Sequence, residues 1–335
     1  MKKALFVMMV LSLAPLSGWT QFFTPGNVIF ADPVDDRVVE LKLSGGFAEI
    51  VQIVTWPLGD MSRRRPLGLD ISPDGTVWVA VTGVPKSATE AVEFPTGRAE
   101  VLRITGDGKQ TFFGTPANKG TFLSTSNSGE VFIMSNAIET TPSIQYRIQV
   151  QGDEISEITE FILSQSLNFY GEALELPDGR ILMGSNGEDG ILVFSQDGGA
   201  PTGKFVQTNR YRSLTYIPEN QKIIALRTDQ STIDRFDLNG TLEDTINAAD
   251  YLYPSLWGTA RIPGTTKFLV GSHNGPAATK NYIGVFDAAN FDNPPEEYVI
   301  TGFEKVGLAA DHQFGSLFNM ASVVQFTPVA SWELY

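Results

Sequence analysis

A short unit recurs along most of this 335-residue chain, and it constrains the fold more than any other feature of the sequence. In each copy an alternating apolar stretch runs into a tight turn, and a strongly apolar strand follows. The clearest copies turn at Pro73-Asp74-Gly75 and at Pro177-Asp178-Gly179. Glycine supplies the positive φ that such hairpin turns need. The unit therefore predicts an antiparallel hairpin that is repeated along the chain.

The spacing of the copies predicts the architecture. The apolar strands after the turns begin near residues 27, 76, 130, 180, 222, 267 and 316. The repeat length is therefore about 40 to 55 residues, which is that of a β-propeller blade. A third and a fourth strand follow most pairs, for example at 100–104 and 110–113. Because four short antiparallel strands per repeat bury apolar faces between neighbours, we predict an all-β fold, a β-propeller of seven four-stranded blades.

The two ends of the repeat leave the closure of the ring open. The last copy is incomplete after Ala321, so the last blade would take a strand from the N-terminal part of the chain. The alternative is six blades, with the C-terminal stretch completing the first. No Gly-, Ser- or Pro-rich linker interrupts the repeat, and no segment keeps a helical periodicity. We therefore expect one domain over residues 21–335.

The N-terminus has the order of a secretory signal peptide. Met1-Lys2-Lys3 is basic, and an apolar run extends from Ala4 to Leu16, which is typical of such signals. A membrane-spanning helix needs about 20 apolar residues, and no segment offers them. We therefore expect residues 1–20 to be a signal peptide, and the mature protein to be secreted or periplasmic without an integral membrane span.

The composition narrows the partners. The chain has no cysteine, which excludes disulfides, thiolate metal sites and a lipid-modified cysteine. Its 38 acidic and 24 basic residues give a net charge of −14. Nucleic acid is bound by basic surface, so this balance argues against such a partner. The one basic cluster, Arg63-Arg64-Arg65, is expected to lie in a solvated loop.

The first copy of the unit carries a family resemblance. In the segment from Asn27 to Leu41, an Ala31-Asp32 pair ends one strand and Arg37 opens the next. This resembles the NHL-type propeller repeat, and the copies with Pro-Asp-Gly turns resemble the related SMP-30 lactonase-like propellers. The resemblance implies that Asp32 caps the turn and pairs with Arg37. It supports the fold far more than a function.

The resemblance to lactonase-like propellers implies a calcium ion in the central channel, which a glutamate and asparagines at the starts of the inner strands would bind. Only one of the matching positions carries a carboxylate; they are Gly68, Phe122, Glu172, Ser213 and Gly258. Calcium takes roughly six to eight oxygen ligands. Glu172 is therefore the candidate ligand for Ca²⁺ or another divalent metal. Asp32 is a second candidate, because it forms a small acidic loop with Asp35 and Asp36, although capping of the turn is the plainer interpretation.

The same region of the fourth copy offers a candidate binding site. Tyr170 and Glu172 lead into an inner strand, and Arg212 and Trp257 hold the equivalent places in the next two copies. Together they would form a channel mouth with one acid, one base and aromatic faces, which suits a polar small molecule or a peptide. Channel-lining polar residues that only bind water are the plainer interpretation.

His273 and Asn274 end an apolar strand and open a long connection. Strand-end loops carry function in many folds, and a histidine there can act as a general base or a metal ligand. The candidate catalytic residues are therefore Glu172, His273 and Asn274.

Two functions from different classes follow. The first is a binding or scaffolding module that engages a protein or a glycan through strand-end loops, including residues 82–98 and 273–281. The alternative is a metal-dependent hydrolase or lyase, similar to the lactonases, that works at the channel mouth.

Overall fold

The structure of the protein is a computed structural model. It describes residues 22–32, 35–85, 98–117, 120–135, 144–163, 170–185, 190–207, 209–227, 231–251, 256–272, 282–301 and 320–322. Their regular secondary structure consists of β-strands and one 3-10 turn, η1 (Ala248–Tyr251). None of the described residues belongs to a helix long and apolar enough to cross a membrane.

Four antiparallel sheets of four strands each come from continuous stretches of the chain. Unit 2 contains β4 (Met61–Ile71), β5 (Val77–Pro85), β6 (Arg98–Ile104) and β7 (Gln110–Gly114). Unit 3 contains β8 (Gly120–Thr125), β9 (Val131–Ser135), β10 (Ile144–Gln151) and β11 (Glu154–Ile162). Unit 4 contains β12 (Tyr170–Glu175), β13 (Ile181–Ser185), β14 (Ile191–Phe194) and β15 (Gly203–Val206). Unit 5 contains β16 (Tyr211–Ile217), β17 (Lys222–Arg227), β18 (Thr232–Phe236) and β19 (Leu242–Asn247).

A fifth sheet of eight strands joins the two ends of the repeat. Its first half, unit 6, contains β20 (Leu256–Arg261), β21 (Lys267–Ser272), β22 (Tyr282–Asp287) and β23 (Glu296–Thr301). Its second half, unit 1, contains β24 (Met320–Ser322), β1 (Val28–Asp32), β2 (Arg37–Ser44) and β3 (Phe47–Val54). The halves meet where β23 pairs in parallel with β3 over three residue pairs.

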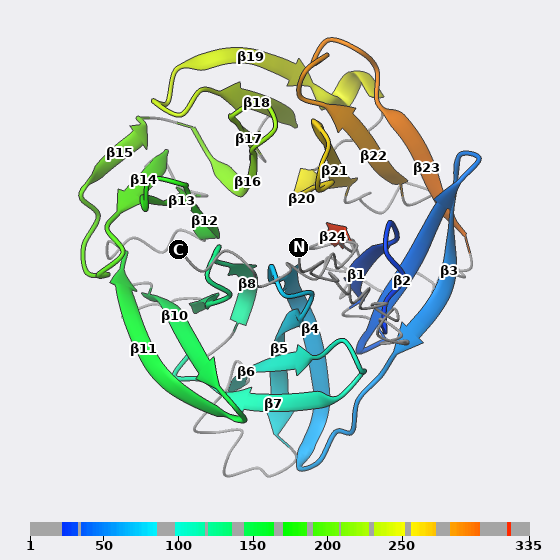
Figure 1. The fold of residues 1–335 in the computed structure, drawn as a ribbon, viewed down its shortest axis with the longest axis vertical. Helices are drawn as coiled ribbons and strands as arrows, with labels where there is room; N and C mark the ends of the chain where they lie inside the picture. Colours follow the sequence, from blue (N-terminus) through cyan, green and yellow to red (C-terminus); the bar gives the residue numbers. More distant parts are fainter. Residues whose placement is uncertain are drawn as a thin grey trace, which may run out of the picture.

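The predicted propeller of four-stranded blades is confirmed, but its count of seven is not. In the part of the chain that the structure describes, the strands form six four-stranded units around a centre (Figure 1). The first and the last copies of the repeat belong to the same unit, because β24 pairs with β1 as its innermost strand. This arrangement matches the six-blade alternative, in which the C-terminal stretch completes the first blade.

The burial of the strands follows their place in each unit. The second strands are apolar on both faces, and every residue of β13 is buried. The outermost strands alternate between buried and exposed residues, as in β3 and β11. A strand covered on both faces reads as a continuous apolar run, whereas a half-covered strand has a period of two.

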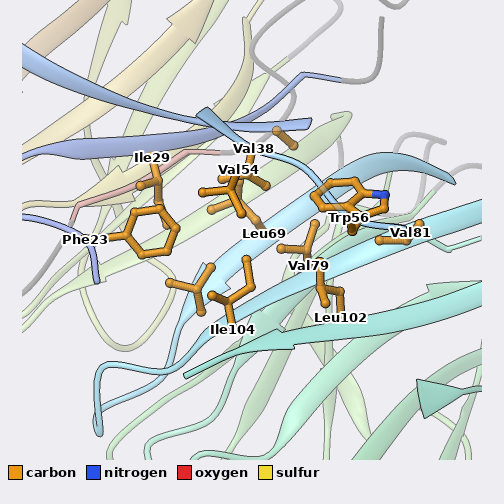
Figure 2. Packing of buried hydrophobic residues seen from close by; sticks show 12 residues of the cluster. Phe23, Ile29, Val38, Val54, Trp56, Leu69, Val79, Val81, Leu102 and Ile104 are labelled. Atoms are coloured by element: carbon orange, nitrogen blue, oxygen red, sulfur yellow. The ribbon is translucent and has the colours of Figure 1, made fainter. Parts of the chain in front are cut away.

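The core is divided into layers between neighbouring units. Figure 2 shows one layer, in which Ile29 and Val38 of unit 1 pack with Leu69 and Val79 of unit 2. Trp56, which follows β3, belongs to the same layer. Burying one aliphatic side chain of this size stabilises a fold by about 1.5–3 kcal/mol. These layers therefore hold the ring together and keep its inner strands in register.

The basic cluster corrects an expectation, since it lies within β4 and not in a solvated loop. Arg64 is buried, and its Nε donates to Glu100 Oε2 at 2.9 Å while its Nη2 donates to Glu100 Oε1 at 3.2 Å. Arg63 Nε donates to Asp36 Oδ2 at 2.9 Å. Because a paired carboxylate offsets the cost of burying a guanidinium, these arginines can occupy a strand.

Candidate binding channel

The inner strands of the units are β24, β4, β8, β12, β16 and β20, and each contacts the next around the centre. We call the face at which they begin the loop face. We call the opposite face, where they turn back into the second strands, the turn face. The turns there are tight, and Gly75 and Gly179 adopt the predicted positive φ of 81° and 84°.

Glu172 lies near the loop-face end of β12 and is only 6% exposed. The Ser213 hydroxyl of β16 donates a short hydrogen bond to its Oε2. Ser213 Oγ in turn accepts the backbone N–H of Thr259 on β20 at 3.0 Å. A chain of hydrogen bonds thus runs from the Glu172 carboxylate across three inner strands.

The backbones of β12 and β16 approach closely beside this chain. A Cβ atom added at Gly171 would lie 1.7 Å from the carbonyl oxygen of Arg212, so only glycine fits. The Arg212 guanidinium carbon lies 6.0 Å from the ring centroid of Phe122 on β8. Burial lowers the pKa of Arg212 to about 10, which leaves it a cation at neutral pH. Arg212 therefore presents positive charge near the loop-face end of the channel.

The other predicted site residues divide into two groups. Tyr170 begins β12, and Trp257 is the second residue of β20, so both lie at the loop-face ends of inner strands, as Glu172 and Arg212 do. His273 and Asn274 lie outside the described residues. The structure thus brings four of the six predicted binding residues to one end of the channel.

Asp32 has the role that the resemblance implies. Its Oδ2 accepts the Nε–H of Arg37 at 2.8 Å, across the hairpin between β1 and β2. Its Oδ1 accepts the backbone N–H of Asp35 at 3.4 Å. Arginine and a turn amide engage both oxygens, so Asp32 acts in the turn.

A cavity that the sequence did not reveal occupies the turn-face half of the channel. It has a volume of about 300 Å³, and inner strands of five units line it. Glu172 lies at its inner end, and the turns at Pro73, Asn127 and Pro263 line its outer end. Polar side chains within otherwise apolar inner strands were the sequence signal for this cavity. That they converge on one cavity depends on how the units are arranged in space, which the sequence of a single unit does not encode.

Asp70 of β4 is one of three carboxylates that line this cavity, with Glu172 and Glu175. Its Oδ2 accepts the backbone N–H of Thr125 at 2.7 Å and the Thr125 hydroxyl at 2.9 Å. Burial raises the pKa of Asp70, while hydrogen bonds from Ile71 and Thr125 and the charge of Arg261 act in the opposite direction. Desolvation is the largest of these effects.

Glu175 of β12 forms a second bridge between units. Its Oε2 accepts the backbone N–H of Asn127, in the first turn of unit 3, at 2.7 Å. Its Oε1 accepts Gln196 Nε2 at 3.1 Å. Glu172, Glu175 and Asp70 therefore all connect neighbouring units around the channel.

The residues where the inner strands begin do not fit a calcium ion. Among the described positions predicted by the resemblance, Glu172 alone carries a carboxylate, and Ser213 binds one of its oxygens. Across the described residues, no group of three or more His, Cys, Asp or Glu side chains is placed to hold a metal ion. The roughly six to eight oxygen ligands of calcium are not assembled there.

Comparison with known proteins identifies the fold. No protein-family model matches the chain, and no curated protein matches its sequence. A chain of the nidogen/laminin complex is similar over 90% of this chain and 99% of its own, with a TM-score of 0.62 and 9% identity. Periplasmic gluconolactonase PpgL of Pseudomonas aeruginosa covers 83% of this chain, and 84% of its own length is matched, with a TM-score of 0.57 and 14% identity.

Virginiamycin B lyase from Staphylococcus aureus is a third similar structure, with 86% of each chain covered, a TM-score of 0.55 and 14% identity. These neighbours confirm, at the level of the fold, the resemblance to NHL and SMP-30 lactonase-like propellers. They include two enzymes and a chain from a protein complex, so the fold is compatible with either predicted function.

Proposed function

We propose that this chain is an extracytoplasmic binding or scaffolding propeller, which engages a protein or a glycan through the connections on its loop face. The observation that carries the proposal is that carboxylates of the inner strands accept hydrogen bonds from residues of neighbouring units. The Ser213 hydroxyl donates a hydrogen bond to the Glu172 carboxylate, and the backbone N–H and hydroxyl of Thr125 donate to the Asp70 carboxylate. These carboxylates join neighbouring units and so contribute to a rigid ring. A rigid scaffold that presents variable connections is a common way to build a binding surface.

The lengths of the connections support the choice of face. On the turn face, the first and second strands are joined by tight turns such as 72–76. On the loop face, the second and third strands are separated by residues 86–97, 136–143 and 273–281 in units 2, 3 and 6. Long connections are where binding residues concentrate. The similar chain from the nidogen/laminin complex supports a protein as the partner.

The compartment is part of the proposal. The basic start and apolar run within residues 1–20 are those of an export signal, and one solved neighbour is a periplasmic enzyme. The mature protein would then be one propeller domain over residues 21–335. N-terminal sequencing of the protein recovered outside the cytoplasm should find a start near residue 21. Recovery with an intact Met1, inside the cells only, would contradict this.

Binding is tested on the full chain with an immobilised array of bacterial and animal glycans, together with extracellular-matrix proteins. We expect a selective ligand whose binding is lost when residues 86–97 are replaced by a short Gly-Ser connection. A turn-face variant, Asn127→Ala, is the matched control and should retain binding. Equal loss in both variants, or no selective ligand, would overturn the proposal.

The hydrolase or lyase alternative has one observation in its favour, since the Glu172 carboxylate lines a cavity beside the Ser213 hydroxyl. Its residues would be Glu172, His273 and Asn274, with a divalent metal. Hydrolysis of a lactone panel, with and without a chelator, tests it. Turnover that both the chelator and Glu172→Gln abolish would establish the enzyme in place of the binding module.

A further inference from the structure

The cavity in the turn-face half of the channel is lined by hydroxyls that have no hydrogen-bond partner among the described residues. Thr215 of β16 is only 8% exposed and lines the cavity, and its hydroxyl forms no hydrogen bond with another described residue. The same holds for the phenol of Tyr216. These hydroxyls are therefore available to hydrogen-bond a polar occupant of the cavity.

The charges around the cavity indicate whether the occupant is a cation or an anion. Three carboxylates line it, and Arg261 is the sole basic residue among the described lining. Asp70 accepts hydrogen bonds from Thr125 and from the backbone N–H of Ile71, all of which are neutral donors. The donors to Glu175 are also neutral. Neither carboxylate forms an ion pair with a described residue, so the cavity is complementary to a cation.

The spacing of the carboxylates favours an organic cation over a metal ion. A metal ion needs its ligands within a single coordination shell. The described carboxylates form no group placed to hold one. Asp70 and Glu175 belong to units 2 and 4, with unit 3 between them. An extended ligand can reach both, and about 300 Å³ corresponds to about ten water molecules, enough for a monosaccharide-sized compound.

We propose that the turn-face cavity binds a small hydroxylated amine of the amino-sugar class. The carboxylate of Asp70 attracts the ammonium group, the carboxylate of Glu175 accepts a hydrogen bond from a hydroxyl at the other end of the ligand, and the hydroxyls of Thr215 and Tyr216 pair with further hydroxyls of the ligand. Arg261, exposed at the turn-face end of β20, disfavours a second positive charge at the rim. This site lies inside the channel and is independent of binding at the loop face.

The test uses the full chain and isothermal titration calorimetry at pH 6, with four probes. Glucosamine carries the ammonium and the hydroxyls, N-acetylglucosamine keeps the hydroxyls without the charge, glucuronate carries the opposite charge, and Ca²⁺ is a compact cation. We expect glucosamine to bind at least tenfold more tightly than N-acetylglucosamine, with no heat from glucuronate or Ca²⁺.

Matched variants locate the site. Asp70→Asn and Thr215→Val should each weaken glucosamine binding by tenfold or more, whereas Glu49→Gln, which removes an exposed charge from β3, should not. Thr215→Val keeps the shape of the side chain, so it remains informative if Asp70→Asn folds poorly.

Several results would overturn the assignment. They are equal binding of glucosamine and N-acetylglucosamine, binding of glucuronate, displacement of glucosamine by Ca²⁺, the same loss in Glu49→Gln as in Asp70→Asn, and no binding by any probe. None of them affects the proposed function, because replacement of residues 86–97 tests the loop face separately.

Discussion

Near the loop-face end of the channel the backbones of neighbouring inner strands approach closely, whereas near the turn-face end the strands are joined by longer side chains. A Cβ at Gly171 would lie 1.7 Å from Arg212 O, and one at Gly68 would lie 2.7 Å from Leu123 N. Towards the turns, the contacts pass instead through the carboxylates of Asp70 and Glu175. The close backbone contact leaves little room at the first end, and the longer reach of side chains leaves a cavity at the second.

The largest effect is expected from Gly171→Ala. The new Cβ would overlap a backbone carbonyl, which cannot rotate away, so β12 or β16 must shift. We expect the free energy of unfolding to fall by about 3 kcal/mol or more, measured by denaturant titration. Gly203→Ala on β15 has open space around its Cβ and should change stability by less than about 0.5 kcal/mol. Similar values for the two variants would contradict the close contact.

Ser213→Ala should have the next largest effect. It removes the donor to the buried Glu172 carboxylate and the acceptor for Thr259 N–H. Leaving such groups unpaired costs about 1–3 kcal/mol, and chemical unfolding would measure it. Ser156→Ala removes an exposed hydroxyl that bonds Gln149 O at 3.3 Å and serves as the control. A Ser213 variant as stable as this control would show that the hydrogen-bond chain is dispensable.

A smaller effect, dependent on pH, is expected from Asp70→Asn at the other end. Burial raises the pKa of Asp70 in the folded protein above its ordinary value of 3.8. The protonated carboxyl of Asp70 therefore contributes to the stability of the wild-type protein. This contribution is fully present below pH 3.8 and is lost as the pH rises through the raised pKa of the folded state. Relative to wild type, the variant should gain stability as the pH rises through the window above 3.8. A difference that is constant with pH would contradict the desolvation of Asp70.

The smallest change in stability is expected from Arg261→Gln, because this side chain is exposed. The unfolding free energy should change by less than about 0.5 kcal/mol. The positive charge of Arg261 lowers the pKa of Asp70, so its removal should raise that pKa, as followed by NMR titration of the carboxyl carbon. Arg65→Gln, on the loop-face part of β4, is the control and should leave the titration unchanged.

The sequence predicted the strands within each unit well, because burial imposes a visible pattern on them. The turns at Gly75 and Gly179 have their predicted conformations, and the Asp32–Arg37 pair is formed. β19 in unit 5 was not predicted, since the segment Leu242–Asn247 is mostly polar and exposed. Local patterns thus identify strands that carry apolar residues, and they miss an outermost strand that is mostly polar.

The number of units and the cavity could not be read in the same way. Counting copies of the unit counts segments of chain, whereas β24 and β1 lie far apart in sequence and share one sheet. The carboxylate of Asp70 meets Thr125, which lies in the next unit. Such contacts depend on how the ring is arranged, and no periodicity within a single copy encodes them.

The pairing of β24 with β1 also sets an order of events during synthesis. A ribosome releases the N-terminal strands first, and the three residues of β24 are the last described segment to emerge. Until then β1 has a bare inner edge, which a chaperone or another chain can occupy. The nascent protein consequently remains an open arc until residues 320–322 have been synthesised, and only then can its ring close.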